Sequence, residues 1–139
     1  MIAVMTTAWV AIQRNPQSGS GRGRRELVEL CCTLRGHGIA PRLFSRRAEL
    51  DRRLQDVVSR DNLVAMVAAG GDGTVVDVVN RHPDLPLAVL PMGTENLLAR
   101  FLGMPASGRD LAEIIAAGRT RKIDIGRANG QLFTLVASA

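Results

Sequence analysis

Residues 63–74, with the sequence LVAMVAAGGDGT, decide the fold class of this 139-residue chain. The segment 63–69 is apolar throughout and has the length of a strand. Continuous rather than alternating hydrophobicity is typical of a strand covered on both faces, as in a parallel sheet. The run Gly70-Gly71-Asp72-Gly73-Thr74 cannot continue that strand, and a helical pattern follows over residues 75–80. The stretch predicts a buried strand, a glycine loop and a helix.

The same alternation of strand and helix is expected along the rest of the chain. Strands are expected at residues 9–14, 39–44 and 86–90, and helices at residues 27–34, 48–59, 95–102 and 109–117. In the helix over 48–59, Leu50, Leu54, Val57 and Val58 are expected on one face. Two last strands, 121–127 and 131–136, are expected to form a hairpin around Asn129-Gly130. This order predicts an open, mostly parallel α/β sheet with helices on both faces.

Three loops of unusual composition follow strands of this sheet. They are residues 15–21, 70–74 and 91–96. In open α/β sheets, ligands bind at the carboxyl ends of the strands. The agreement in placement of the three loops therefore predicts a binding site at that edge.

The glycine loop has the composition of a phosphate-binding segment. Glycines let backbone N–H groups approach phosphate oxygens, and the start of the next helix adds free N–H groups and partial positive charge. Thr74 can cap this helix or donate its hydroxyl to a phosphate. Asp72 has three readings: contact with Mg²⁺ through water, general base toward an acceptor hydroxyl, or a turn aspartate bonded to nearby amides.

The other two loops are less specific when each is taken alone. The first contains Gly19, Gly21 and Gly23, but it matches neither the dinucleotide fingerprint nor the P-loop. In the third, Thr94 or Glu95 could cap a helix, and Asn96 could bond a ligand or brace the neighbouring loop.

Composition narrows the classes of protein. No stretch approaches the ~20 consecutive apolar residues of a membrane-spanning helix, and the N-terminus lacks the basic leader and cleavage pattern of a signal peptide. Adjacent Cys31 and Cys32 are expected to be buried, reduced thiols of a cytoplasmic protein, and His37 and His82 to be surface residues.

The formal net charge of +5 comes almost wholly from arginine. Arginines gather at positions 22, 24 and 25 and again at 46, 47, 52 and 53. Such clusters can be solvated helix faces, or they can meet nucleotide phosphates or anionic membranes. Nucleic acid is not expected as a partner, because aromatic residues make up only 3% and base-stacking platforms are missing.

Three motifs, taken together, resemble the catalytic domain of the diacylglycerol kinase and sphingosine kinase family, including bacterial lipid kinases. They are Asn15-Pro16 with Ser18-Gly19, then Gly70-Gly71-Asp72-Gly73-Thr74 with Asn80, then Pro91-x-Gly93-Thr94-x-Asn96 with Ala99-Arg100, and the late Asp124-x-Gly126 also fits. NAD kinases and phosphofructokinases share the glycine loop, whereas its combination with the third loop is more specific to lipid kinases. The resemblance covers nearly the whole chain and implies the N-terminal, nucleotide-binding domain of that fold.

The resemblance implies ATP as phosphoryl donor, with Mg²⁺, and a lipid hydroxyl as acceptor. The residues it implies for the ATP site are Asn15, Pro16, Gln17, Ser18, Gly19, Ser45, Gly70, Gly71, Asp72, Gly73, Thr74, Val75, Val76, Thr94 and Asn96. Asp72 would be catalytic, and no residue is assigned as a protein metal ligand. Ser45 stands where the family tends to have threonine, and Val76-Asp77 where an asparagine–glutamate pair is common.

Relatives of this family look about twice as long and have a β-rich second domain. Residues 1–139 are therefore expected to be the ATP-binding domain of a lipid kinase, poorly active alone, because half a cleft stays open to water. The alternatives are a non-catalytic nucleotide-binding or regulatory module, and an NAD kinase-like enzyme. The sequence does not indicate an oligomeric state.

Overall fold

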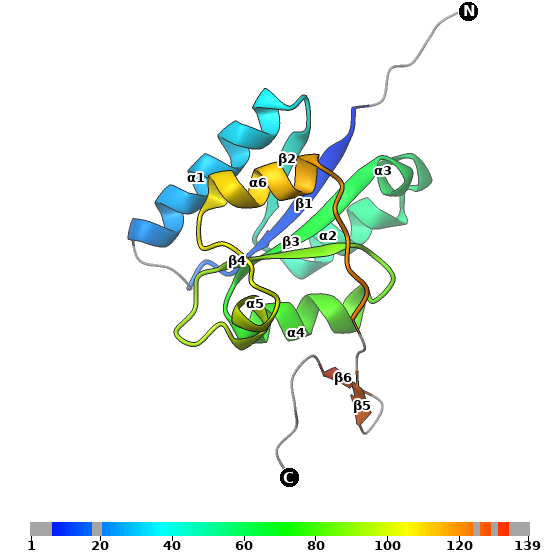
Figure 1. Ribbon diagram of the computed structural model, residues 1–139. Coiled ribbons are helices and arrows are strands. Elements are labelled where there is room, and N and C mark those ends of the chain that lie inside the picture. Colours follow the sequence, from blue (N-terminus) through cyan, green and yellow to red (C-terminus); the bar gives the residue numbers. More distant parts are fainter. Residues whose placement is uncertain (1–6, 18–20, 124–125, 129–130, 134–139) are drawn as a thin grey trace, which may run out of the picture.

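A four-stranded, all-parallel sheet forms the centre of the molecule in the computed structural model, which describes residues 7–17, 21–123, 126–128 and 131–133. Its strands are β1 (Trp9–Arg14), β2 (Ala40–Phe44), β3 (Leu63–Gly70) and β4 (Leu87–Pro91), in the order β2-β1-β3-β4 (Figure 1). The expected open parallel α/β sheet is confirmed.

The strand order places a change of direction between β1 and β3. The chain runs from β1 outward to β2, then crosses back to β3 on the other side of β1 and continues to β4. Crossovers on either side of such a point leave a crevice at the carboxyl ends of the strands. The loops that follow β1 and β3 therefore begin side by side, with Arg14 paired to Ala69.

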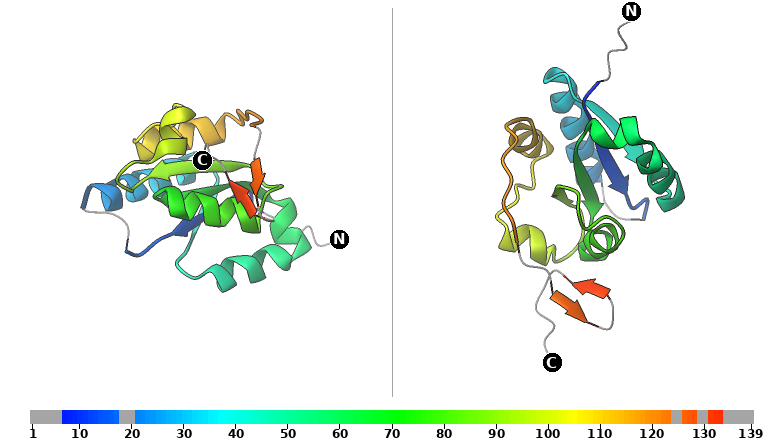
Figure 2. Two further views of the ribbon diagram at one scale, coloured as in Figure 1. Left: turned by 90° about the horizontal axis from the view of Figure 1, so that it is seen from below. Right: turned by 90° about the vertical axis from the view of Figure 1, so that its right-hand side faces the viewer.

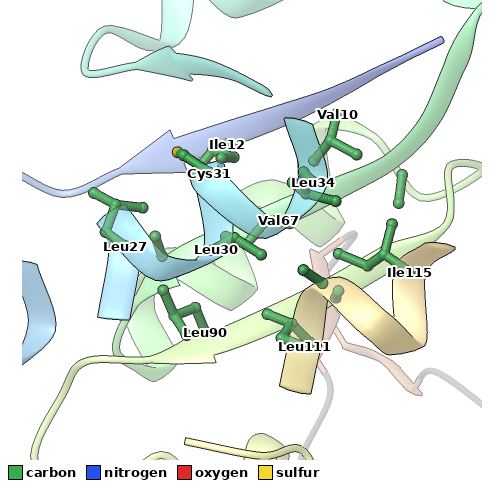
Figure 3. Packing of buried hydrophobic residues seen from close by; sticks show 14 residues of the cluster. Val10, Ile12, Leu27, Leu30, Cys31, Leu34, Val67, Leu90, Leu111 and Ile115 are labelled. Atoms are coloured by element: carbon green, nitrogen blue, oxygen red, sulfur yellow. The ribbon is translucent and has the colours of Figure 1, made fainter. Parts of the chain in front are cut away.

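One face of the sheet is covered by α1 (Gly21–Gly36) and α6 (Gly108–Ala116). Figure 3 shows their leucines packed over Val10, Ile12 and Val67. A Cβ on Gly108 would collide with the backbone carbonyl oxygen of Glu26, so the two helices meet nearly backbone to backbone. Glu26 also accepts the N–H of Gly108 through its carboxylate, at 2.7 Å. This face is a closely packed apolar layer.

The opposite face carries α2 (Arg47–Gln55), α4 (Asp72–Arg81) and α5 (Leu97–Phe101), as the views of Figure 2 show. Because side chains alternate along a strand, Trp9 and Ala11 point to this face while Val10 and Ile12 point to the other. Helices on both faces were predicted, and they are present.

The prediction of a single helix over residues 48–59 is wrong in its second half. It ends with α2, and a short helix α3 (Val57–Asp61) starts after Asp56. Asp56 has an extended backbone, and its carboxylate accepts the N–H of Ser59 at 2.9 Å, so it ends one helix and caps the next. Leu50 and Leu54 are buried as predicted, but Val57 and Val58 are 68% and 54% exposed.

The predicted hairpin is present; its first strand begins later than expected, and residues 134–136 of the second lie outside the described residues. It consists of β5 (Gly126–Ala128) and β6 (Gln131–Phe133), which pair antiparallel with Ala128 opposite Gln131. The expected turn at Asn129-Gly130 lies outside the described residues, and residues 121–123 are not in a strand. The hairpin lies beside α4 (Figure 1).

The expectation for the cysteines is half right. Cys31 is buried, whereas the adjacent Cys32 is exposed, because neighbours on a helix face different directions. Burial raises the pKa of the Cys31 thiol above its ordinary value, despite the nearby charge of Arg35. Within the described part of the chain, no helix is long and apolar enough to cross a bilayer.

Candidate functional site

The three loops singled out in the sequence meet at the carboxyl edge of the sheet. The backbone N–H of Asn15, just after β1, donates to the carbonyl of Ala69 at 3.3 Å. The backbone N–H of Met92, just after β4, donates to the carbonyl of Gly70 at 3.0 Å. The end of β3 therefore holds both neighbouring loops, and the glycine loop lies between them.

The second and third loops touch through two glycines that bear no side chains. A Cβ added to Gly93 would lie 2.6 Å from the Cα of Gly71, and one added to Gly71 would lie 3.3 Å from the Cα of Gly93. Since real Cβ contacts are not that short, any side chain at Gly93 would force the loops apart. Glycine at position 93 is required by this close backbone approach, and a side chain at Gly71 would need its neighbour to shift by a few tenths of an ångström.

Asn96 fixes the shape of the third loop. Its Oδ1 accepts the N–H of Gly93 at 2.9 Å, and its Nδ2 donates to the carbonyl of Gly93 at 2.8 Å. Its backbone is left-handed, with φ 52°, a conformation that asparagine tolerates better than most residues. The sequence predicted that Asn96 would bond a ligand or brace the neighbouring loop, whereas the bonds observed brace its own loop. The predicted cap at Thr94 or Glu95 is wrong, because α5 begins after Asn96 and has no side-chain cap.

The start of α4 has the form of an anion site. Its N-cap is Gly71, so no side chain caps the first N–H groups of this ten-residue helix. Gly73 is exposed and has open space where a Cβ would be. Free N–H groups, the positive end of the helix and absent side chains suit a phosphate group.

Thr74 is turned away from that open space. A Cβ on Gly70 would collide with the Thr74 hydroxyl, and Thr74 is only 9% exposed. Gly70 is therefore glycine because Thr74 packs against its backbone. In this structure the Thr74 side chain packs against the strand-to-helix turn.

Asp72 joins α4 to α5. Its Oδ1 accepts the backbone N–H of Leu98, in the first turn of α5, at 3.4 Å. One interpretation expected Asp72 to bond amides of its own turn. Its Oδ1 does bond an amide, but that amide belongs to α5. Among the described residues, Oδ2 has no hydrogen-bond partner, which leaves it available for chemistry.

The remaining predicted residues divide into loop-shaping, exposed and buried ones. Asn15 Oδ1 accepts the N–H of Gln17 at 3.0 Å and so shapes its own turn. Pro16, Gln17, Ser45 and Thr94 are exposed at or near the carboxyl edge, Val76 is partly buried, and the side chain of Val75 is in the core, 1% exposed. Ser18, Gly19 and Asp124 lie outside the described residues.

A polar network beside the glycine loop was not predicted. Asp77 on α4 accepts from Gln13 Nε2 of β1 at 2.8 Å and pairs with Arg81 at 3.1 Å and with Arg47 of α2 at 3.2 Å. Arg81 also bonds Gln13 and Asp51. A glutamine inside the apolar run of β1, and an acid and an arginine four residues apart on a helix, were the available signals.

His82 belongs to the same network, so the expectation of a surface histidine is wrong. Its Nε2 lies 2.7 Å from Asp51 Oδ1, and its side chain is 11% exposed. His37, by contrast, is exposed and lies 3.0 Å from Glu113. We refer to Gln13, Asp51, Asp77, Arg81 and His82 as the α2–α4 network.

The network lowers the pKa of the Asp77 carboxyl. Partial burial acts to raise this pKa, but hydrogen bonds from Gln13 and Arg81 and the charges of Arg81 and Arg47 outweigh it. Asp77 therefore stays ionised and holds α4 toward β1 and α2.

The edge offers little to a metal ion by itself. In residues 7–17, 21–123, 126–128 and 131–133, no group of three histidine, cysteine or acidic side chains could hold one. At the glycine loop, Asp72 is the carboxylate that could meet a Mg²⁺ ion carried by a nucleotide, through its Oδ2.

Fold and site together define an α/β domain with three glycine-containing loops at one edge, at the change of direction of its sheet. The family model of the diacylglycerol kinase catalytic domain matches residues 10–128. The chain belongs to this family, as the motifs had indicated.

Several proteins similar to this chain are named diacylglycerol kinases. The chain is 33% identical over 129 residues to diacylglycerol kinases of Staphylococcus aureus strains bovine RF122 / ET3-1 and MRSA252, over 89% of this chain and 41% of each relative. A crystal structure of a diacylglycerol kinase from Bacillus anthracis str. Sterne matches with a TM-score of 0.69 and 26% identity, over 94% of this chain and 49% of that one. The chain thus spans less than half the length of these relatives.

Proposed function

We propose that this chain is the ATP-binding domain of a lipid kinase that transfers the γ-phosphoryl group of ATP to a hydroxyl of diacylglycerol, sphingosine or a related lipid. Family membership supports this class of activity. The observation that carries the proposal is the junction of the glycine loop with the third loop, where Gly71 meets Gly93 beside the uncapped start of α4.

Each part of the junction has a role in holding the nucleotide. The N–H groups at the start of α4 bind phosphate oxygens, and the bare backbones of Gly71 and Gly73 let the phosphates come close. Exposed hydroxyls of Ser45 and Thr94 stand at the same edge to donate hydrogen bonds. ATP, when bound with Mg²⁺, supplies the phosphoryl group.

Asp72 is the residue to which we assign proton transfer or contact with Mg²⁺ through water. Its Oδ1 is oriented by Leu98 and its other oxygen is available, so its position is fixed without use of both oxygens. Phosphoryl transfer depends mainly on positioning and electrostatic stabilisation, which one wall of a cleft supplies incompletely. We therefore expect nucleotide binding from residues 1–139 and catalysis only from a longer protein, acting in the cytoplasm on lipids.

Nucleotide binding is tested by titrating the chain with ATP and Mg²⁺ in a calorimeter. Gly71→Asp puts a negative side chain where phosphate would lie and against Gly93, so binding should be lost. Gly36→Asp is the matched control, because Gly36 ends α1 with open space around it. Equal affinities of wild type and Gly71→Asp would refute the site.

The class of acceptor needs the full-length protein. Radiolabelled ATP should transfer its label to diacylglycerol, sphingosine or a related lipid, and Asp72→Asn should abolish the transfer. Label on NAD would favour the NAD kinase-like alternative, and binding of ATP without transfer would favour the non-catalytic module.

A further inference from the structure

A cavity of about 730 Å³ opens beside β4, which is an edge strand of the sheet. Its walls are β4, the helices α5 and α6, and residues 118–123, which run from the end of α6 toward the hairpin (Figure 1). Among the described residues, none that we assign to ATP lines it. Its volume falls within the range of about 300–1,000 Å³ that is usual for small-molecule sites. We call this feature the β4–α6 cavity.

The interior of the cavity is apolar and reaches between the two helical layers. Met104, in its wall, packs against both core clusters, one on each face of the sheet. Ile115 of α6 lines the cavity from one layer, and Leu98 and Leu102 line it from the other. These side chains offer no hydrogen bonds to water, so a hydrocarbon chain would gain from taking its place.

Positive charge gathers in the part of the wall that follows α6. Arg119, Arg121 and Lys122 line the cavity, and all three are exposed. The acid in the wall is Asp84, and no ion pair between described residues involves any of these four side chains. Three cations against one acid leave the wall positive. The cationic groups can therefore bind a carboxylate without first giving up another partner.

We propose that the β4–α6 cavity binds a single-chain anionic amphiphile of the fatty-acid class. The hydrocarbon chain lies between the two helical layers, and the carboxylate lies at Arg119, Arg121 and Lys122. Charge complementarity selects an anionic head, and the apolar interior selects a chain. The walls formed by β4 and two helices select one chain rather than the flat surface of a bilayer. The proposal goes beyond the proposed function, because it gives a second ligand to a part of the fold that we do not assign to ATP.

Titration of the chain with dodecanoate in a calorimeter, below its micelle-forming concentration, gives the first test. Dodecanoate should saturate one site per chain, and dodecyltrimethylammonium, which has the same tail and a cationic head, should bind far more weakly. Each buried methylene group adds about fourfold in affinity, so decanoate should bind about fifteenfold more weakly than dodecanoate. Equal binding of the two dodecyl compounds, or the same affinity for both carboxylates, would overturn the proposal.

The cationic part of the wall has its own test. The triple variant Arg119→Gln, Arg121→Gln, Lys122→Gln should bind dodecanoate about tenfold more weakly, because charge-assisted hydrogen bonds to the carboxylate are lost. The ratio of its affinities for dodecanoate and decanoate should stay that of wild type, since the contacts of the chain remain. Unchanged affinity in this variant would overturn the assignment of the head.

A matched variant controls for net charge. Arg52→Gln, Arg60→Gln and Arg109→Gln remove the same charge from exposed sites that do not line the cavity. This triple variant should bind dodecanoate as wild type does. Equal losses in the two triple variants would overturn the proposal, because the attraction would then be one of net charge alone.

The apolar interior is tested by filling it. Ile114 lines the cavity from α6 and is partly buried, so Ile114→Trp should lower the affinity for dodecanoate at least tenfold. Val57→Trp, at an exposed residue of α3 outside the cavity, should leave it unchanged. Thermal unfolding shows whether each variant is folded, and Leu87→Trp fills the cavity from β4 if Ile114→Trp is not. Wild-type affinity in a folded, filled variant would place the ligand elsewhere and overturn the proposal.

Competition with nucleotide separates this site from the proposed ATP site. Excess ATP with Mg²⁺ should not displace dodecanoate, because the residues assigned to ATP do not line the cavity. Displacement would put the amphiphile at the glycine loop and overturn the proposal. A chain that binds dodecanoate with these properties but binds no ATP would refute the proposed function and leave the β4–α6 cavity as a ligand site.

Discussion

The two helical layers of this domain are held against the same sheet in different ways. On one face, α1 and α6 pack through leucines and through the close contact of Gly108 with the backbone of α1. On the other face, α2 and α4 share an apolar core but are also joined by the α2–α4 network, which reaches β1 through Gln13. The first layer is mainly apolar, with the Glu26–Gly108 hydrogen bond and the exposed His37–Glu113 pair beside it, and the second adds a connected network of charged side chains.

The layer that contains the α2–α4 network is also the layer next to the proposed site. The network contacts Gln13, two residues before Asn15 of the first loop, and Asp77, on the helix that begins at the glycine loop. An ionic network has directional bonds, so it can fix a helix relative to a strand more narrowly than aliphatic packing does. The face that carries the glycine loop is the one where such bonds form a network that reaches the sheet.

The largest effect is expected from Gly108→Ala on the apolar layer. Its methyl group would collide with the carbonyl of Glu26, and backbone cannot move aside without separating α1 from α6. We expect a loss of about 3 kcal/mol or more in the free energy of unfolding, measured with urea. Gly36→Ala, with open space around it, should change stability by less than about 1 kcal/mol. A stable Gly108→Ala protein would show that this layer can adapt.

The next effect is expected from Asp77→Ala in the α2–α4 network. It leaves the partly buried Arg81 with Asp51 as its remaining acid, so the free energy of unfolding should fall by about 2 kcal/mol near neutral pH. Asp84→Ala, which removes an exposed acid, should cost less than about 0.5 kcal/mol. Similar values for the two variants would mean that the network does not stabilise its layer.

The pH dependence separates charge from shape within that layer. Since folding lowers the pKa of Asp77, its charge stabilises the protein above the ordinary value of 3.8, and this contribution is lost as pH falls through the lower folded pKa. Wild type should therefore exceed Asp77→Asn in stability near neutral pH, and the two should converge in acid. A difference independent of pH would assign the effect to shape.

The smallest effect is expected outside both layers. Val57 on α3 is 68% exposed, so Val57→Ser should change the free energy of unfolding by less than about 0.5 kcal/mol. A loss above about 1 kcal/mol would indicate a contact for α3 that neither layer provides.

Most of the fold could be predicted because its signals are local. The apolar run before Gly70 fixed a buried strand, and the spacing of Leu27, Leu30 and Leu34 fixed a helix face. The helix break at Asp56 was missed because the helical spacing of Leu50 and Leu54 continues into Val57 and Val58. The break depends on a single side chain, the Asp56 carboxylate that caps α3. Hydrophobicity alone cannot separate a helix end from a helix interior.

The site was predicted in composition but not in its contacts. The sequence indicated that Gly70 to Thr74 and Pro91 to Asn96 lie at one edge, since both follow parallel strands. It did not indicate that Gly93 touches Gly71 or that Asp72 accepts from Leu98. These contacts join residues that are separated by 22 and 26 positions in the sequence. Hydrophobic periodicity does not reveal contacts at such sequence separations.

What the sequence by itself determined is the order of elements other than α3, the glycine loop and the family. These features follow from hydrophobic periodicity over a few residues and from the positions where only glycine allows the backbone conformation or a close approach. Only the tertiary structure decided which groups meet: Asp77 of α4 bonds Gln13 of β1 and Arg47 of α2, and Gly93 touches Gly71. The physical reason is that a side chain's partners depend on how helices lie across the sheet, which is settled when the whole core packs.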